Sequence, residues 1–342
     1  MAAARGRRSD WRAGARRADR ERRGPLPRRR ARGPRDRGRA RRVQRRGRRV
    51  PVVSGSCRGY PARPIPDLRA PSRRTTGNLD ARTLRRMTSD ALPSNFAWRG
   101  ETTAETGVRE RDFAIDVAGE SIPGVLWSPE GATGPLPLVL LGHGGRSNKR
   151  ANSMQTIGRR LARRQGFIAA SIDQIEHGDR DPLMQPDNLE RYAAMWTHPG
   201  VIETSTRQWR AVTSALAALP EVDAERIGYW GLSMGSMFGM PFVAEEPRIR
   251  AAVLGLASLT GPSVDRSGIR PSFEAAAPKI TCPVMWVVQW NDQQFDREGS
   301  FALFDLLGSP NKRLIAFPGL HGEAPDESTA LTREFLGREL AP

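Results

Sequence analysis

Residues 230–236 read Trp-Gly-Leu-Ser-Met-Gly-Ser, and this stretch contains the pattern Gly-x-Ser-x-Gly around Ser233. Such a short pattern also arises by chance, so the flanking residues decide what it means. The apolar run RIGYW precedes it and the apolar stretch MFGMPFVA follows it. A strand that turns sharply into a helix needs small residues beside the turn, and Gly231 and Gly235 provide them. The context predicts that Ser233 sits on a strand-to-helix turn and acts as a nucleophile.

A serine hydroxyl is a weak nucleophile unless a base takes its proton, and the base in turn needs an acid to orient it. His321, in the segment FPGLHGEAP directly after the last predicted strand, is the best candidate for the base. Asp292 follows the apolar run VVQW by two residues and is the expected acid, with Asp296 as the alternative. Asp296 is also placed to cap the next helix.

The tetrahedral intermediate of such a reaction needs backbone donors for its negatively charged oxygen. The N–H of the residue after the nucleophile, Met234, is expected to be one donor. The second is expected in the loop GHGGR at 142–146, where Gly145 is the first choice and Gly144 its alternative. We interpret His143 as a residue that holds this loop rather than as a second base.

Strand and helix signals alternate along residues 109–340, which predicts an α/β fold with a mostly parallel sheet and helices on both faces. The carboxyl ends of the strands in such a sheet lie at one edge, where sites form. A hairpin is expected at a sheet edge, from 109–118 and 121–129. Further strands are expected at 137–145, 167–173, 226–231, 250–257, 284–290 and 313–319, and helices at 154–165, 204–220 and 327–340.

The net charge of +18 hides two different segments. Residues 1–86 contain 30 arginines, no lysine and six acidic residues, a net charge of +24, so the rest of the chain carries −6. The first segment lacks the apolar residues for a core and is predicted to be disordered. We favour a misassigned start, with the true start near Met87; a charged tail and a targeting peptide are the alternatives. We expect a linker at 87–104 and one domain at 105–342.

Cofactors and membranes are not indicated by the composition. The chain has two cysteines, Cys57 and Cys282, which argues against a disulfide framework and against a zinc cluster, so no metal or organic cofactor is expected. No apolar stretch reaches the length of a membrane span, and no apolar region follows the charged N-terminus. The default expectation is a cytoplasmic protein.

Four segments, GHGGR, GLSMGS, CPVMWVVQWND and FPGLHG, occur in this order at 142–322. Together they resemble the α/β-hydrolase superfamily, and within it the branch of dienelactone-hydrolase-like and small serine esterases. The resemblance covers about residues 105–340 and implies the α/β-hydrolase fold with the chain order Ser, Asp, His. Dienelactone hydrolases proper carry cysteine at the turn, where this chain has Ser233, and many relatives have glycine at Ser236.

The expected function is cleavage of carboxylic esters through a covalent acyl-enzyme. The segments 178–203 and 258–273 are too short for a large lid domain and are expected to form the rims of an open cleft. The side chains expected to contact a small-molecule ester are Arg146, Trp290, Met195 and Trp196. Trp290 could instead pack under its loop, and Met195 and Trp196 could instead be packing residues.

Two alternative functions remain open from the sequence. The same three residues serve thioesterases, amidases and acyltransferases, which only a substrate panel separates. A nucleic-acid-binding protein with an Arg-rich tail and an inactive hydrolase-like body is the other alternative. The net negative charge after residue 86 disfavours nucleic acid as a partner.

Overall fold

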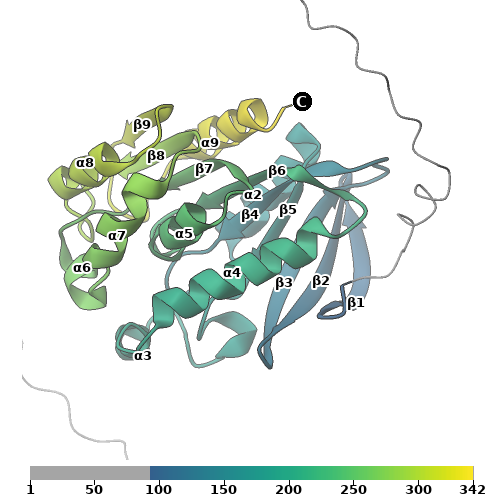
Figure 1. Ribbon diagram of the computed structural model, residues 1–342, viewed down its shortest axis with the longest axis horizontal. Helices are drawn as coiled ribbons and strands as arrows, with labels where there is room; N and C mark the ends of the chain where they lie inside the picture. The colour runs from purple at the N-terminus through teal and green to yellow at the C-terminus, as the bar shows by residue number, and fades with distance from the viewer. Residues whose placement is uncertain (1–92, 342) are drawn as a thin grey trace, which may run out of the picture. The chain divides into compact units, whose positions relative to one another are not determined.

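Residues 93–341, which the computed structural model describes, contain nine strands in one sheet (Figure 1). The order across the sheet is β1-β2-β3-β5-β4-β6-β7-β8-β9. The strands are β1 (Phe96–Glu105), β2 (Val108–Val117), β3 (Glu120–Pro129), β4 (Leu136–Gly142), β5 (Ile168–Ile172), β6 (Val222–Gly231), β7 (Ile249–Gly255), β8 (Val284–Gln289) and β9 (Lys312–Phe317).

The six strands from β5 to β9 in this order run parallel, whereas β1, β2 and β3 form an antiparallel meander that joins β5. Strand β4 is LPLVLLG, and all but its first residue are buried. A strand that is covered on both faces reads as such a continuous apolar run. The parallel arrangement brings the carboxyl ends of β4 to β9 to one edge of the sheet.

Helices cover both faces of the sheet, as the alternation predicted. In Figure 1, α4 and α5 lie in front of the sheet. The helices are α2 (Asn152–Gln165), α3 (Leu189–Met195), α4 (Val201–Ala217), α5 (Met234–Glu245), α6 (Pro262–Ser267), α7 (Arg270–Ala276), α8 (Arg297–Leu306) and α9 (Asp326–Glu339), with short 3₁₀ turns η1 (Gly178–Arg180) and η2 (Ala277–Lys279).

Helix α2 forms where the apolar spacing predicted it. Met154, Ile157 and Leu161 lie on one face of the helix and are buried. Gly166 ends the helix in the left-handed conformation, with φ of 70°, and its N–H donates to the carbonyl of Leu161. Glycine adopts this conformation without steric cost, so the sequence signal and the helix end agree.

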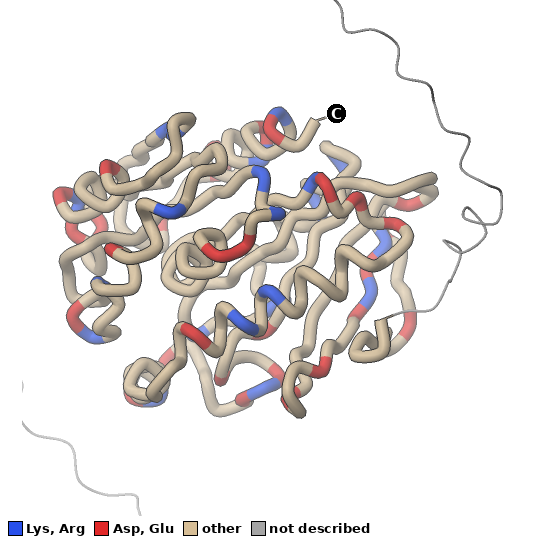
Figure 2. The backbone as a smooth tube through the Cα atoms, viewed as in Figure 1, with Lys and Arg blue, Asp and Glu red and all other residues tan. Residues whose placement is uncertain are grey.

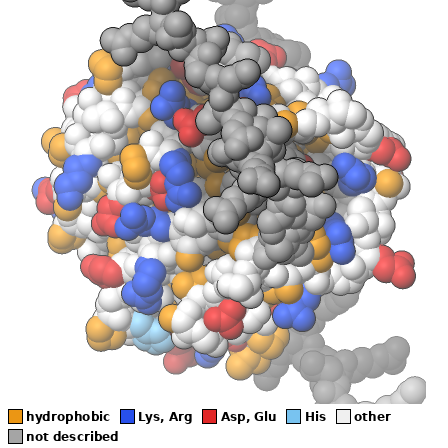
Figure 3. Space-filling view, turned by 45° about the vertical axis from the view of Figure 1, so that its right-hand side comes forward, with side chains coloured by type: hydrophobic (Ala, Val, Ile, Leu, Met, Phe, Trp, Pro, Cys, Tyr) orange, Lys and Arg blue, Asp and Glu red, His pale blue; other side chains and the backbone are white. Residues whose placement is uncertain are grey.

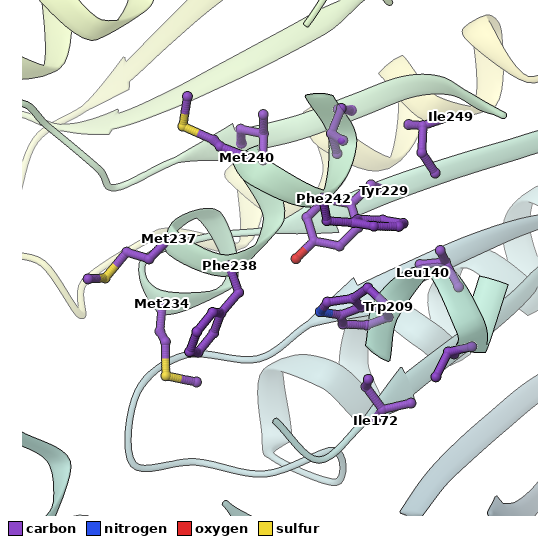
Figure 4. Close-up of a cluster of buried hydrophobic side chains, with 14 of the residues drawn as sticks. Leu140, Ile172, Trp209, Tyr229, Met234, Met237, Phe238, Met240, Phe242 and Ile249 are labelled. Carbon is purple, nitrogen blue, oxygen red and sulfur yellow. The ribbon is translucent and has the colours of Figure 1, made fainter. Parts of the chain in front are cut away.

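Two apolar cores lie on opposite faces of the sheet. One joins the sheet to α2 and α9 through residues such as Trp127, Leu161 and Phe335. The other packs α4, α5 and α7 against the sheet, and Figure 4 shows part of it, with Trp209 beside Tyr229 and Phe242. Helix α5, which follows Ser233, is buried from Met234 to Val243.

Two details of the fold differ from the expectations. The expected linker spans 87–104, and within it residues 96–104 belong to strand β1, which pairs with β2. The predicted hairpin of β2 and β3 is present, yet it is not at the sheet edge because β1 covers β2. The expectations for the Arg-rich segment and for a start at Met87 lie outside the described residues.

Charges are mixed over the described part of the chain. Basic and acidic residues are interspersed along the backbone in Figure 2, and the face in Figure 3 shows both signs among hydrophobic and uncharged side chains. The helices within residues 93–341 include none with the length and hydropathy of a membrane span.

Candidate active site

Ser233 stands between the end of β6 and the first residue of α5, Met234, with φ of 59° and ψ of −124°. Few non-glycine residues adopt positive φ, so the neighbouring structure must hold this turn. The N–H of Ser233 donates to the carbonyl of Gly255 on β7 at 3.1 Å. A Cβ on Gly235 would lie 2.4 Å from the carbonyl oxygen of Gly142, so only glycine lets α5 approach β4 this closely.

The hydroxyl of Ser236 bridges two strands below the turn. The backbone N–H of Gly255 on β7 donates to Ser236 Oγ at 2.8 Å. The same oxygen lies 2.7 Å from the carbonyls of Gly231 and Gly255 and can donate to one of them at a time. The serine therefore connects the end of β6 to the end of β7.

A chain of hydrogen bonds links three side chains from three different loops. His321 Nε2 lies 2.8 Å from Ser233 Oγ, and His321 Nδ1 lies 2.7 Å from Asp292 Oδ2. A carboxylate only accepts, so Nδ1 carries the proton and Nε2 accepts the hydroxyl proton of Ser233. The side chains of His321 and Asp292 are 12% and 4% exposed. The structure thus brings together the three residues that the sequence order predicted.

Backbone groups hold Asp292 in place. Its Oδ1 accepts the N–H groups of Gln294 at 2.8 Å and Phe295 at 3.1 Å, which leaves Oδ2 for His321. The alternative acid, Asp296, stands at the N-cap position of α8, where its side chain makes no capping hydrogen bond. Among the described residues, the carboxylate that contacts His321 is that of Asp292.

Strained backbone gathers at this edge of the sheet. Four residues with positive φ and a side chain follow four neighbouring strands: Glu176 (54°) after β5, Arg146 (54°) after β4, Ser233 after β6 and Leu256 (47°) after β7. Such conformations cost about 1–3 kcal/mol each and persist only where the surroundings enforce them.

Gly144 and Gly145 of the loop after β4 line the same cavity as Ser233. His143, fully buried, lies with Nδ1 2.8 Å from the carbonyl of Gly144 and accepts the N–H of Gln174 on Nε2 at 3.1 Å. Burial lowers the pKa of His143 from 6.5 to about 3, so the ring is neutral and serves the loop, as expected. The N–H groups of Gly145 and Met234 donate to no acceptor among the described residues.

A buried ion pair holds the next part of this loop. Lys149 Nζ lies 2.7 Å from Asp173 Oδ2 and 2.6 Å from Asp179 Oδ2, and the side chain of Asp173 is fully buried. Burial alone would lower the pKa of Lys149, but the hydrogen bonds to both carboxylates outweigh it and raise the pKa. The contact ties the loop after β4 to the loop after β5.

A cavity of about 400 Å³ opens beside Ser233 and His321. Its wall combines the glycines of the loop after β4 with hydroxyl, amide and aromatic side chains. The lining residues include Gly144, Gly145, Arg146, Ser153, Met154, Tyr192, Leu256, Gln294, Ser328 and Thr329.

Comparison with known proteins gives the family. A model of the dienelactone hydrolase family matches residues 122–305, which is more than half of the chain. The chain belongs to the dienelactone hydrolase family. It is a hydrolytic enzyme of the esterase type with the α/β-hydrolase fold. A comparison with curated protein sequences found no significant match.

Solved structures of similar proteins agree with the family. The chain is 32% identical to a cold-adapted esterase from an Arctic intertidal metagenomic library, over 72% of this chain and 100% of that one, with a TM-score of 0.63. An acetyl xylan esterase from Paenibacillus sp. R4 is 18% identical over 75% of this chain and 92% of its own, with a TM-score of 0.54. The latter likeness shows the fold alone.

Of the four residues expected to contact substrate, Arg146 lines the described cavity of this dienelactone hydrolase family member, and the other three do not. Arg146 lines the cavity, and its guanidinium donates to the carbonyl of Pro186. Met195 and Trp196 are buried in the core that packs α4, α5 and α7 against the sheet, and neither lines the cavity. Trp290 is 48% exposed and stacks with Arg297, whose guanidinium carbon lies 4.3 Å from the ring centroid.

Tyr192 is one of the cavity residues that the sequence does not single out. It lies on α3, one turn before Met195, and its ring covers Gly145. A Cβ at Gly145 would lie 2.7 Å from ring atoms of Tyr192. The sequence places the segment 178–203, which contains Tyr192, at the rim of the cleft. It does not indicate which aromatic residue of that segment contacts the loop after β4.

Proposed function

We propose that the enzyme cleaves small carboxylic esters through a covalent acyl-enzyme, with Ser233, His321 and Asp292 as its catalytic triad. The observation that carries the proposal is the hydrogen-bond chain from Asp292 Oδ2 through His321 to Ser233 Oγ, at 2.7 and 2.8 Å. Such a chain supplies the base and the orienting acid that a serine nucleophile needs. The site belongs to the three loops after β6, β8 and β9.

In the proposed reaction, Ser233 Oγ attacks the ester carbonyl carbon while its proton passes to His321 Nε2. The carbonyl oxygen becomes an oxyanion that accepts the N–H groups of Met234 and Gly145. The tetrahedral intermediate collapses, the C–O bond to the alcohol breaks, and the alcohol leaves with the proton from His321. Water then attacks the acyl-enzyme by the same sequence, which returns the proton to Ser233.

The cavity supports a small, polar substrate. About 400 Å³ holds a short acyl or alcohol group, and hydroxyl groups of Ser153, Ser328 and Thr329 stand in its wall. Arg146 is the one permanently charged side chain in the described lining, so we include preference for an ester with a carboxylate in the proposal. No described feature favours thioesters, amides or nucleic acid as substrates or partners.

Replacement of Ser233 by Ala tests the proposal. Because the members of a triad act as a unit, Ser233→Ala is expected to lower kcat on the order of 10⁶-fold. The measurement is hydrolysis of a panel of oxygen esters, thioesters and amides, together with labelling by a fluorophosphonate probe. The urea unfolding midpoint should stay near that of the wild type. Equal labelling of wild type and Ser233→Ala would refute the proposal.

A further inference from the structure

A second buried histidine, His177, lies next to the loop after β4. It takes no part in the hydrogen bonds that link Ser233, His321 and Asp292. It follows β5, is fully buried, and its ring centroid lies 5.2 Å from that of His143. A buried imidazole needs partners for both ring nitrogens, because an unpaired polar atom in the interior costs about 1–3 kcal/mol. Its two partners define what it does.

The hydrogen bonds of His177 determine its tautomer. Nδ1 lies 2.7 Å from the carbonyl oxygen of Ile175, which can only accept, so Nδ1 carries the proton. Nε2 therefore has a free lone pair, and it accepts the backbone N–H of Arg146 at 3.0 Å. Burial lowers the pKa of His177, which keeps the ring in this uncharged form. In a protonated ring Nε2 would also carry a proton, so it could no longer accept the N–H of Arg146.

The two histidines together fix both peptide groups that flank Gly145. In a trans peptide the C=O and N–H bonds point in opposite directions. His143 holds the carbonyl of Gly144 inward, which turns the N–H of Gly145 away from the buried ring. His177 holds the N–H of Arg146, which fixes the plane of the following peptide. Gly145 lines the cavity of Ser233, and its N–H donates to no acceptor among the described residues, which leaves it free for a group bound there.

The ring of Tyr192 closes the arrangement from the other side. It lies 6.1 Å from the His177 ring, edge to face, and it packs on Gly145. Gly145 therefore has His143 and His177 on its flanking peptides and Tyr192 on its Cα. Its conformation is determined by side chains from three segments, after β4, after β5 and on α3.

We propose that His177 is a positioning residue for ester cleavage: by accepting the N–H of Arg146 it keeps the N–H of Gly145 aimed at the oxyanion. This inference rests on the proposed function. It assigns to His177 an effect on the transition state through the loop, without contact with the substrate. Loss of one oxyanion donor costs about 10²–10³ in kcat, which sets the largest effect expected.

Two substitutions separate the two hydrogen bonds of the ring. In His177→Gln, the amide oxygen reaches the position of Nε2 and can accept the N–H of Arg146. In His177→Asn, the shorter amide can replace Nδ1 and donate to Ile175, but it cannot reach Arg146. We expect kcat for an oxygen ester to fall about 10²-fold in His177→Asn, with KM changed only a few-fold, and to stay within about tenfold of wild type in His177→Gln.

The rate on a thionoester separates loss of an oxyanion donor from a general packing defect, because a packing defect would slow both kinds of ester alike. The sulfur of a thionoester accepts hydrogen bonds weakly, so its cleavage depends little on the oxyanion donors. The ratio of oxygen-ester to thionoester rates should fall about 10²-fold in His177→Asn and stay near wild type in His177→Gln. If both variants lose activity equally on both esters, or if His177→Asn keeps the wild-type ratio, the proposal is wrong. Full hydrolysis by Ser233→Ala would instead overturn the proposed function, so the two failures are distinguishable.

Discussion

At the scale of single residues, Arg146 stands apart from the other charged side chains around the site. Its guanidinium contacts the carbonyl of Pro186, and no carboxylate among the described residues forms an ion pair with it. Nearby Arg150, by contrast, pairs with Glu110 and Asp112 away from the cavity. An unneutralised charge in a half-enclosed cavity attracts anionic groups more strongly than one in open water.

Arg146→Ala is therefore expected to remove a preference for esters that carry a second, free carboxylate. We expect kcat/KM for such an ester to fall about tenfold relative to the neutral ester of equal length. Arg146→Lys should keep part of the preference, and 1 M salt should weaken it in the wild type. Arg150→Ala serves as the control for general loss of charge. An identical substrate profile in wild type and Arg146→Ala would contradict this role.

At the scale of elements, α3 acts as a brace rather than as a lid. Its Tyr192 packs on Gly145, and Trp196, directly after the helix, stacks on Phe238 of α5 with centroids 4.9 Å apart. Tyr192 and Trp196 also contact each other edge to face at 6.0 Å. The seven-residue helix thus connects the loop that holds one proposed oxyanion donor with the helix that begins at the other.

This brace predicts different effects at two adjacent glycines. In Gly145→Ala the new Cβ would lie 2.7 Å from the Tyr192 ring, so the loop must shift. A displacement of about 1 Å in a catalytic group can cost 10²-fold, and we expect a loss of kcat of up to that size. Gly144→Ala is the matched control, because nothing lies within 4 Å of a Cβ there. Steady-state kinetics of both variants, and of Gly145→Ala with Tyr192→Ala, measure the effect.

The double variant is expected to recover part of the kcat that Gly145→Ala loses, since the ring that obstructs the Cβ is gone. If Gly144→Ala and Gly145→Ala lose the same activity, contact with Tyr192 does not explain the glycine.

The elements show which parts of the molecule could be predicted from sequence. Ser233, Asp292 and His321 each follow an apolar strand, and parallel strands bring such loops to one edge, so their proximity could be predicted. Strand β1 could not, because only Phe96 of its ten residues is buried and no apolar alternation marks it. Which residues at α3 face the interior could not be predicted either, because this depends on contacts with α5 and with the loop after β4.

At the scale of the whole molecule, two buried histidines make stability depend on pH. Burial, with His177 and Lys149 adding to it, lowers the pKa of His143 from 6.5 to about 3. The unfolded chain takes up a proton as pH falls through 6.5, whereas the folded protein does so only near 3. Unfolding therefore binds a proton in this window, and the free energy of unfolding decreases as pH falls.

The expected slope is about 1.4 kcal/mol per pH unit for His143 below its ordinary pKa, and His177 contributes in the same direction. Urea unfolding of wild type and His143→Gln from pH 7 to pH 4 measures this slope. The contributions of the carboxylates cancel in the difference between the two free energies of unfolding. The wild type should lose more stability on acidification than the variant. Parallel curves would show that His143 titrates normally in the folded protein.

The four strained residues at the carboxyl edge of the sheet have a consequence for how the sequence can change over generations. Glycine at Glu176 would relieve backbone strain and keep the nucleophile, at the cost of the carboxylate that pairs with His198. Glycine at Ser233 would relieve similar strain and remove the nucleophile. A descendant sequence can therefore exchange Glu176 for glycine and remain an enzyme by the proposed mechanism, whereas selection for activity must keep the strained serine at 233.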